Sequence, residues 1–242
     1  MISFVTTIKI CSGYNDYASR LETYINNIYD GCTLRGISYE IIVVEDQNEK
    51  NTRFIRDIFT ESYLSIHHVR LIEFEAKYPN PHGYNMIEAY GKNVGIKNAK
   101  HKIVCVTNCD IWFSEHFFEF IPNFEINTFY RFMQYEVDEK KEVCLNSSIT
   151  SNMLVDVAYK SGDIMLMDKR SWLKIRGFPE NGVWVHSDYI VCMVVQNNQI
   201  PLVIVPEPVR VYTMQQTRSA RSDETCFELK TTYKYIKANT CN

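Results

Sequence analysis

Residues 89–110 read AYGKNVGIKNAKHKIVCVTNCD, and this stretch decides the fold. Its first half predicts a helix. The run from Ile103 to Thr107 predicts a strand covered on both faces, because it is β-branched and almost uncharged. Asp110 follows at the point where such a strand meets solvent. Ligands bind at the carboxyl ends of strands in open α/β sheets, so the stretch predicts an α/β protein with Asp110 at an active-site edge.

The rest of the chain extends this alternation of strands and helices. Apolar runs and helical spacing in the first half predict strands over 2–10, 39–45, 69–74 and 102–107, and helices over 15–29, 53–59 and 86–98. Strands joined by helical crossovers imply a largely parallel sheet with helices on both faces. The second half is less regular and predicts strands over 129–137, 163–168 and 201–205, and helices over 115–121, 171–175 and 187–196.

Length and composition bound the domain count and the partners. The chain has 242 residues, of which 45% are hydrophobic, enough for one sizeable core and a single domain. A net charge of -3 without a long basic run excludes a broad attraction to nucleic acid. No apolar segment approaches the roughly 20 residues of a spanning helix, and the first residues do not resemble a signal peptide. We therefore expect a cytoplasmic protein, soluble or peripheral to a membrane; the sequence does not specify an oligomeric state.

The eight cysteines are predicted to be reduced thiols, most of them buried. Cys105 and Cys192 lie inside apolar runs, and the sequence contains no C-x-x-C pair or Cys/His cluster of the kind that binds zinc. A chain of this size does not need disulfides to hold a core, and a reducing compartment disfavours them.

Several ordered segments resemble one family. Lys92-Asn93-Val94-Gly95 and Asn108-Cys109-Asp110 resemble the (K/R)-N-x-G helix and the strand ending in D-x-D of nucleotide-sugar glycosyltransferases with the GT-A fold, particularly inverting family 2. The resemblance implies a Rossmann-like GT-A domain, with a nucleotide-binding half over about 1–110 and an acceptor half over about 111–212. A polar tail or lid over 213–242 would follow.

The resemblance also implies a set of donor-binding residues. Thr6-Thr7-Ile8 resembles the opening strand that contacts the base and ribose, and Glu45-Asp46 resembles the acidic pair that holds the uracil or ribose. A UDP-sugar is the implied donor. The nucleotide-binding residues expected on this basis are Thr6, Thr7, Ile8, Glu45, Asp46, Lys92, Asn93, Asn108 and Asp110.

The acceptor side is predicted from the second half. Gly162-Asp163 resembles the start of the family's acceptor-side element, and His186-Ser187-Asp188 stands where the family places the carboxylate that acts as base. Trp184 lies in a predicted loop and could stack on a sugar ring. We expect Asp188 to take the proton of the acceptor hydroxyl, and Gly162, Asp163, Trp184 and His186 to contact the acceptor or the sugar.

The metal expected from the resemblance, Mn²⁺ or Mg²⁺, would have a weak site. Asn108 replaces the first Asp of D-x-D and offers a neutral oxygen, whereas hard divalent cations prefer carboxylates and phosphates. Asp110 and the donor diphosphate would supply most of the ligands. Alternatively, Lys92 and two arginines of the tail, Arg218 and Arg221, would stabilise the diphosphate that departs.

The expected function is therefore an inverting transfer of a sugar from a nucleoside diphosphate to a hydroxyl of a glycan or other acceptor. The alternative is a catalytically silent module of the same fold that binds sugar nucleotides or glycans. Two other enzyme classes fit less well. A nucleotidyltransferase would want a Gly-rich basic loop after the first strand, and a dinucleotide-binding dehydrogenase would want G-x-G-x-x-G there; Cys11-Ser12-Gly13-Tyr14 supplies neither.

Overall fold

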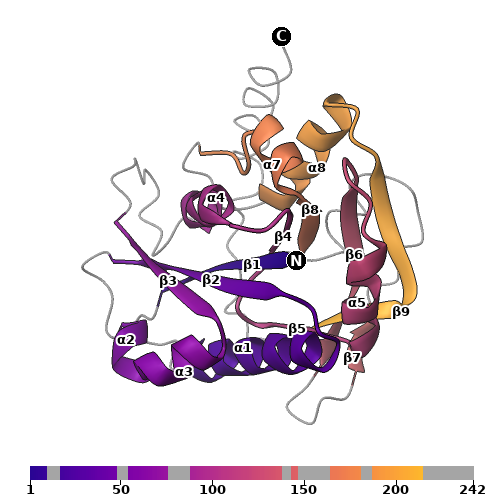
Figure 1. Ribbon diagram of the computed structural model, residues 1–242. Coiled ribbons are helices and arrows are strands. Elements are labelled where there is room, and N and C mark those ends of the chain that lie inside the picture. Colours follow the sequence, from indigo (N-terminus) through magenta and orange to yellow (C-terminus); the bar gives the residue numbers. More distant parts are fainter. Residues whose placement is uncertain are drawn as a thin grey trace.

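The computed structural model describes residues 1–9, 17–47, 54–75, 88–137, 143–146, 164–180 and 187–214 (Figure 1). The first half of the chain forms β1 (Ile2–Ile8), α1 (Tyr17–Leu34), β2 (Tyr39–Asp46), α2 (Ile55–Ile58), α3 (Glu61–Ile66), β3 (Val69–Phe74), α4 (Glu88–Asn98) and β4 (Ile103–Val106). The second half forms β5 (Ile111–Phe113), α5 (Glu115–Phe120), the 3-10 helix η1 (Ile121–Asn123), β6 (Phe129–Val137), β7 (Val143–Asn146), β8 (Met165–Asp168), α7 (Lys169–Lys174), α8 (Ser187–Asn197) and β9 (Leu202–Met214).

The first four strands form the parallel part of one sheet. β1 pairs in parallel with β2 on one side and β4 on the other, and β3 pairs in parallel with β2. Every residue of β1 and β2 is buried. This is why the two runs lack the polar alternation of a half-exposed strand, and the predicted parallel α/β sheet with helices on both faces is confirmed.

The remaining strands extend the sheet with mixed directions. The order is β3-β2-β1-β4-β8-β6-β9-β5, with β7 also paired to β6. β8 runs antiparallel to β4 and β6, whereas β9 runs parallel to β6 and antiparallel to β5. The sequence did not predict β5, β7 or α3, which are short elements of three to six residues.

The strand predicted over 201–205 was too short. β9 continues to Met214, although Pro206 and Pro208 interrupt its apolar run. The sheet accommodates both prolines at a register shift: Phe132 of β6 pairs with Val205, and Met133 pairs with Arg210. Residues 206–209 are therefore left out of the ladder, where proline costs no hydrogen bond.

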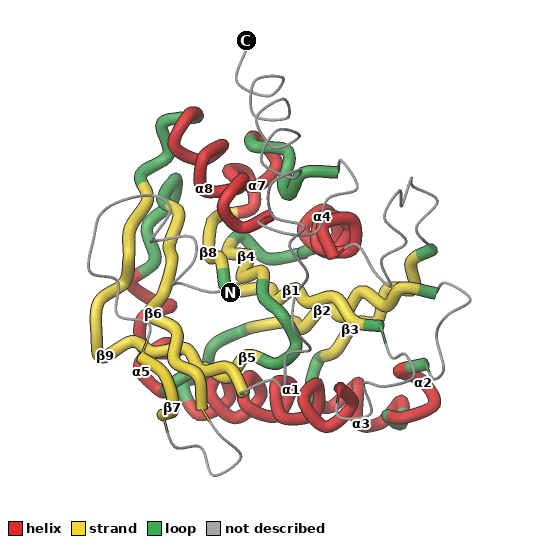
Figure 2. The backbone as a smooth tube through the Cα atoms, turned by 180° about the vertical axis from the view of Figure 1, so that it is seen from behind, coloured by secondary structure: helices red, strands yellow, loops and turns green. Residues whose placement is uncertain are grey.

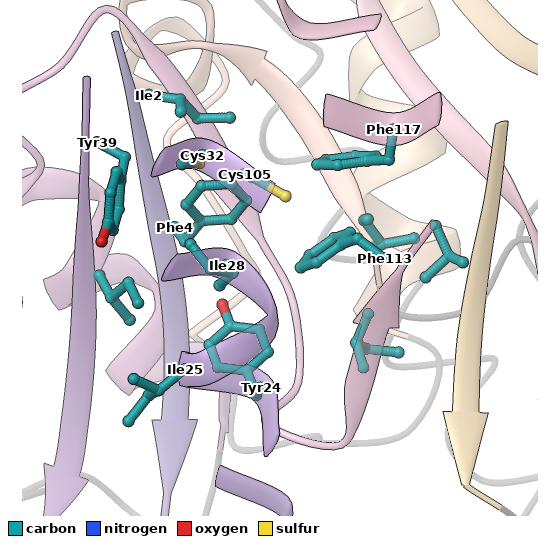
Figure 3. Packing of buried hydrophobic residues seen from close by; sticks show 14 of the residues in the cluster. Ile2, Phe4, Tyr24, Ile25, Ile28, Cys32, Tyr39, Cys105, Phe113 and Phe117 are labelled. Carbon is teal, nitrogen blue, oxygen red and sulfur yellow. The ribbon is translucent and has the colours of Figure 1, made fainter. Parts of the chain in front are cut away.

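Helices cover both faces of the sheet. In Figures 1 and 2, α1, α2 and α3 lie on one side of the parallel strands and α4, α7 and α8 on the other. Alternate residues of each strand supply two cores. Phe4 and Cys105 pack with α1 and with aromatic residues of β5 and α5, as Figure 3 shows, while Val5 and Val104 pack with α4, α7 and α8. In the part of the chain that the structure describes, no helix is both long and apolar enough to cross a membrane.

Two glycines bring α4 close to β1. A Cβ atom on Gly95 would lie 2.2 Å from Cγ1 of Val5, and one on Gly91 would lie 2.5 Å from Cγ2 of Thr7. Because the helix backbone sits directly on the sheet at these glycines, side chains next to them in the sequence become buried. Lys92, expected at the surface or at the donor, is 2% exposed.

Candidate functional site

The carboxyl ends of β1, β2 and β4 bring most of the predicted donor residues to one edge of the sheet. Ile8 pairs with Glu45 across β1 and β2, and Val5 pairs with Val106 across β1 and β4. The amide of Thr107 donates a hydrogen bond to the carbonyl of Val5 at 2.9 Å, which holds the segment after β4 beside β1. Six predicted residues lie near or just beyond the carboxyl ends of these strands: Thr6, Thr7, Glu45, Asp46, Asn108 and Asp110. Ile8 itself belongs to the core on the α1 side.

The hydroxyls of two threonines are buried at this edge. Thr6 is 0% exposed and Thr7 5%. Within the described ranges, neither hydroxyl oxygen has a hydrogen-bond partner. An unsatisfied buried polar group costs about 1–3 kcal/mol, and such a group at a strand end suits contact with a polar ligand.

The two acidic residues that end β2, Glu45 and Asp46, face opposite sides of the sheet. Glu45 accepts hydrogen bonds from the backbone amide of Ile55 at 2.7 Å and from Nε2 of Gln47 at 2.9 Å. It therefore anchors the start of α2. Burial raises the pKa of the Glu45 carboxyl to about 7, although these two hydrogen bonds oppose the shift. Asp46, the next residue, is also buried and belongs to the opposite face of the strand, the face that α4 covers.

Lys92 and Asn93 of α4 contact the segment that follows α7. Nζ of Lys92 lies 2.8 Å from Oε2 of Glu88 and 5.4 Å from the ring centre of Phe178. The Asn93 amide donates to the carbonyl of Phe178 and accepts from its amide, at 2.9 and 2.8 Å. Both side chains thus fasten α4 to the segment after α7, and their predicted contacts with a nucleotide stay predictions. That segment approaches so closely that a Cβ on Gly177 would meet Oδ1 of Asn93 at 2.1 Å.

Asp110 lies beside an arginine that the sequence did not identify. Nη1 of Arg20, in the first turns of α1, is 3.8 Å from Oδ2 of Asp110. Both side chains are close to buried, with exposed fractions of 11% and 9%. A sequence signal existed: Arg20 precedes Tyr24 by four residues and so lies on the helix side that faces the core.

The described side chains around Asp110 offer few ligands for a divalent cation. Asn108 offers a neutral oxygen, and Cys109 is buried in the core on the α1 side, where burial raises the pKa of its thiol and keeps it protonated. The guanidinium of Arg20 already faces the carboxylate of Asp110. No group of three or more His, Cys, Asp or Glu side chains in the described ranges could hold a metal.

The predicted base, Asp188, reaches the same edge of the sheet from α8. Its Oδ2 lies 3.8 Å from Nη2 of Arg131, a side chain of β6 that is 0% exposed. Tyr130 pairs with Leu166, and Leu166 pairs with Cys105 of β4. Arg131 therefore lies on β6 close to the level at which β4 ends. Asp188 itself is 20% exposed.

Arg131 is the second residue that sequence reasoning missed. It interrupts the apolar run Phe129 to Met133, and a charged residue in a buried strand is rarely left without a partner. That interruption was the available signal. Six other predicted residues lie outside the described ranges: Gly162, Asp163, Trp184, His186, Arg218 and Arg221.

Comparison with solved structures identifies the fold. Residues 1–349 of TarS from S. aureus, solved with UDP-GlcNAc, superpose with a TM-score of 0.66 and 13% sequence identity, over 98% of this chain and 66% of that one. The same fragment solved with UDP gives a TM-score of 0.64 and 14% identity over 99% and 65%. The chain thus spans slightly less than two thirds of these TarS fragments. No protein-family model and no curated protein sequence matches it.

TarS is a family 2 glycosyltransferase of the GT-A type. At this identity the likeness defines the architecture. The chain has the GT-A fold.

Proposed function

We propose that the protein is an inverting glycosyltransferase that binds a nucleoside-diphosphate sugar, a UDP-sugar, at the carboxyl edge of β1, β2 and β4. It transfers the sugar to a hydroxyl of a glycan or other acceptor. One observation carries the proposal: the donor-side cluster and the carboxylate of Asp188 share one edge of a GT-A sheet. The TarS fragment of the same fold was solved with UDP-GlcNAc and with UDP.

The donor end of the site supplies hydrogen-bonding groups for a nucleoside. Thr7 and Asp46 lie on the face of the sheet that α4 covers, and both are at least 95% buried. A carboxylate accepts hydrogen bonds from two neighbouring hydroxyls, such as those of a ribose. Hydrogen bonds to a charged group contribute about 1.5–3 kcal/mol each, enough to set nucleoside affinity.

The acceptor end supplies a base. Inverting transfer is an in-line displacement at the anomeric carbon: the acceptor oxygen forms the new bond while the bond to the diphosphate oxygen breaks. Asp188 takes the proton that the acceptor hydroxyl loses, an effect of typically about 10²–10⁴-fold. The guanidinium of Arg131, a buried residue of β6, faces the carboxylate of Asp188 at 3.8 Å. The mechanism uses no step through a divalent ion, and the metal expected from the family resemblance stays a prediction.

Calorimetric titration with UDP, GDP, ADP and UDP-GlcNAc tests donor binding. We expect selective binding of one nucleoside diphosphate, and Asp46→Asn to weaken it at least tenfold, about 1.4 kcal/mol. Asp30→Asn is the matched control, because Asp30 is exposed in the last turns of α1. Its affinity should stay within twofold of wild type.

Two results would contradict the proposal at different levels. If no nucleotide binds to the folded protein, the donor site is wrong. If a nucleotide sugar binds but is neither transferred nor hydrolysed with any acceptor, the silent sugar-nucleotide module is the better description.

A further inference from the structure

Three aromatic side chains form a row across β6, β9 and β5, the strands at one end of the described sheet (Figure 2). Tyr135 of β6 pairs with Tyr212 of β9, and Tyr212 pairs with Trp112 of β5. Their ring centres are 6.1 and 5.5 Å apart. Residues that pair across strands share one face of a sheet, and the neighbouring Phe113 and Val211 belong to the core on the α1 side. The aromatic row therefore lies on the other face.

One end of the row is fixed and the other is open. The hydroxyl of Tyr135 donates to the carboxylate of Glu207, and the guanidinium of Arg210 lies 5.1 Å from the Tyr135 ring centre. Tyr135 is buried, whereas Tyr212 and Trp112 are only half-buried. The part of the row that a ligand can reach is thus the pair Tyr212 and Trp112.

These two rings line a cavity of about 400 Å³. Small-molecule sites have volumes of about 300–1,000 Å³, so the cavity can hold a ligand. Polar and charged side chains from the end of α1 and the start of α5 complete the lining, among them Arg35, Glu115 and His116. The cavity therefore combines flat aromatic faces with hydrogen-bonding groups.

Contacts within the protein fix the walls of the cavity. A Cβ on Gly31 would lie 2.2 Å from Cε2 of Phe118, so α1 and α5 touch directly at this glycine. The side-chain amide of Asn27 donates to the carbonyl of Phe113 at 3.1 Å and accepts from its amide at 2.8 Å. All four residues line the cavity. Its shape is thus set before a ligand binds, as in most ligand sites.

This lining suits a neutral sugar. One face of a pyranose consists of C–H groups that pack on an aromatic ring, while the hydroxyls around its rim bond to carboxylates and guanidinium groups. The charge of Arg35 is already matched, because its Nη2 lies 3.1 Å from Glu119 and 3.8 Å from Glu115. The cavity thus carries no excess positive charge to attract a phosphate.

A peptide is the less suitable occupant. Extended peptides add to a sheet edge through main-chain hydrogen bonds. β5 has three residues, and Asn27 occupies both the N–H and the C=O of Phe113. The edge of β5 is therefore closed to strand addition at Phe113, which favours a ligand recognised by side chains.

We propose that this cavity is a second, non-catalytic site that binds a neutral oligosaccharide, with one pyranose packed on Trp112 and Tyr212. It lies beside α1, whereas Asp188 belongs to α8 on the other side of the parallel strands (Figures 1 and 2). The bound sugar is therefore not the one whose hydroxyl reacts. The inference concerns binding alone and goes beyond the proposed transfer.

An array of neutral oligosaccharides of glucose, galactose, mannose, rhamnose and N-acetylglucosamine, with apolar and acidic peptides beside them, tests the inference. Wild type should bind at least one oligosaccharide, which is then titrated by calorimetry. Trp112→Leu keeps much of the apolar volume but loses the flat ring, and should lower the affinity at least about fivefold. Tyr212→Phe keeps its ring and should stay within about twofold of wild type. If Trp112→Leu does not fold, the comparison of Tyr212→Leu with Tyr212→Phe decides by the same threshold.

Tyr29→Leu is the matched control. Tyr29 is a half-buried aromatic residue of α1 outside the cavity, its ring centre 4.6 Å from that of His67, and its loss should leave the affinity within about twofold. The inference is overturned if folded wild type binds no oligosaccharide, if only peptides bind, or if Trp112→Leu loses less than about fivefold. An equal loss in Tyr29→Leu would overturn it too. Because the probes carry no nucleotide, a failed titration with UDP would contradict the proposed function and leave this result intact.

Discussion

Replacing Asp188 by Asn should reduce both stability and turnover. Stability falls because the carboxylate faces the buried Arg131, and turnover falls because Asn cannot take the proton of the acceptor hydroxyl. Asn keeps the shape but removes the charge that faces Arg131 at 3.8 Å. Two unit charges at this distance interact by about 4 kcal/mol at an effective dielectric constant of 20, and by about 1 kcal/mol in water. Arg131 is 0% exposed and Asp188 is 20% exposed, which places the pair between these limits. We expect Asp188→Asn to lower the free energy of unfolding by about 2–4 kcal/mol.

A double-mutant cycle separates the ion pair from other effects of the change. Urea unfolding of Asp188→Asn, Arg131→Met and the double variant should give a coupling energy of about 1–3 kcal/mol. The exposed pair of Arg56 and Glu73 is the control. Its atoms are closer, at 3.0 Å, but the side chains are 68% and 45% exposed, so its coupling should stay below about 1 kcal/mol.

The catalytic part of this prediction needs a separate readout. Folded Asp188→Asn should bind UDP within a few-fold of wild type and lower transfer or hydrolysis of the UDP-sugar by about 10²-fold or more. Near-wild-type turnover would refute Asp188 as the base. A coupling energy near zero, or one no larger than that of the Arg56–Glu73 pair, would refute the reasoning that burial dominates the Arg131 contact.

Two further predictions concern stability. The pKa of Glu45 in the folded protein is about 7, against an ordinary value of 4.5. Its contribution to the free energy of unfolding is therefore full below pH 4.5 and is lost as the pH rises through 7. The free energy of unfolding of Glu45→Gln should therefore rise by about 3 kcal/mol relative to that of wild type between pH 4.5 and 8, as measured by urea unfolding. A difference between the two proteins that stays constant over this range would contradict the shifted pKa. Gly95→Ala should destabilise by about 1–2 kcal/mol, because overpacking against Val5, 2.2 Å from the new Cβ, exceeds the gain in helix propensity. Val5→Ala in the same protein should relieve most of that cost, and additive effects of the two changes would show that no clash exists.

The sequence by itself determined the parallel half of the fold. The strands predicted over 39–45 and 69–74 match β2 and β3 to within one residue, and Asp110 was predicted beyond the end of β4, where it lies. Buried parallel strands must be apolar on both faces, and the crossover helices must carry an apolar stripe. Both requirements leave a local signal in the chain. The family resemblance supplied the expected donor residues, and their gathering at one edge follows because parallel strands end at the same edge of a sheet.

Only the tertiary structure decided how the second half of the chain folds and which charged side chains of the site face one another. The length of β9 depends on its pairing with β6 and β5, since its prolines argue against a strand until a register shift places them outside the ladder. The partners of Asp110 and Asp188 come from Arg20, 90 residues earlier in the chain, and Arg131, 57 residues earlier. Such pairs leave no periodic pattern, because an ion pair depends on two positions that folding alone brings together. Local sequence can reveal a buried face, but not which distant charge will meet it.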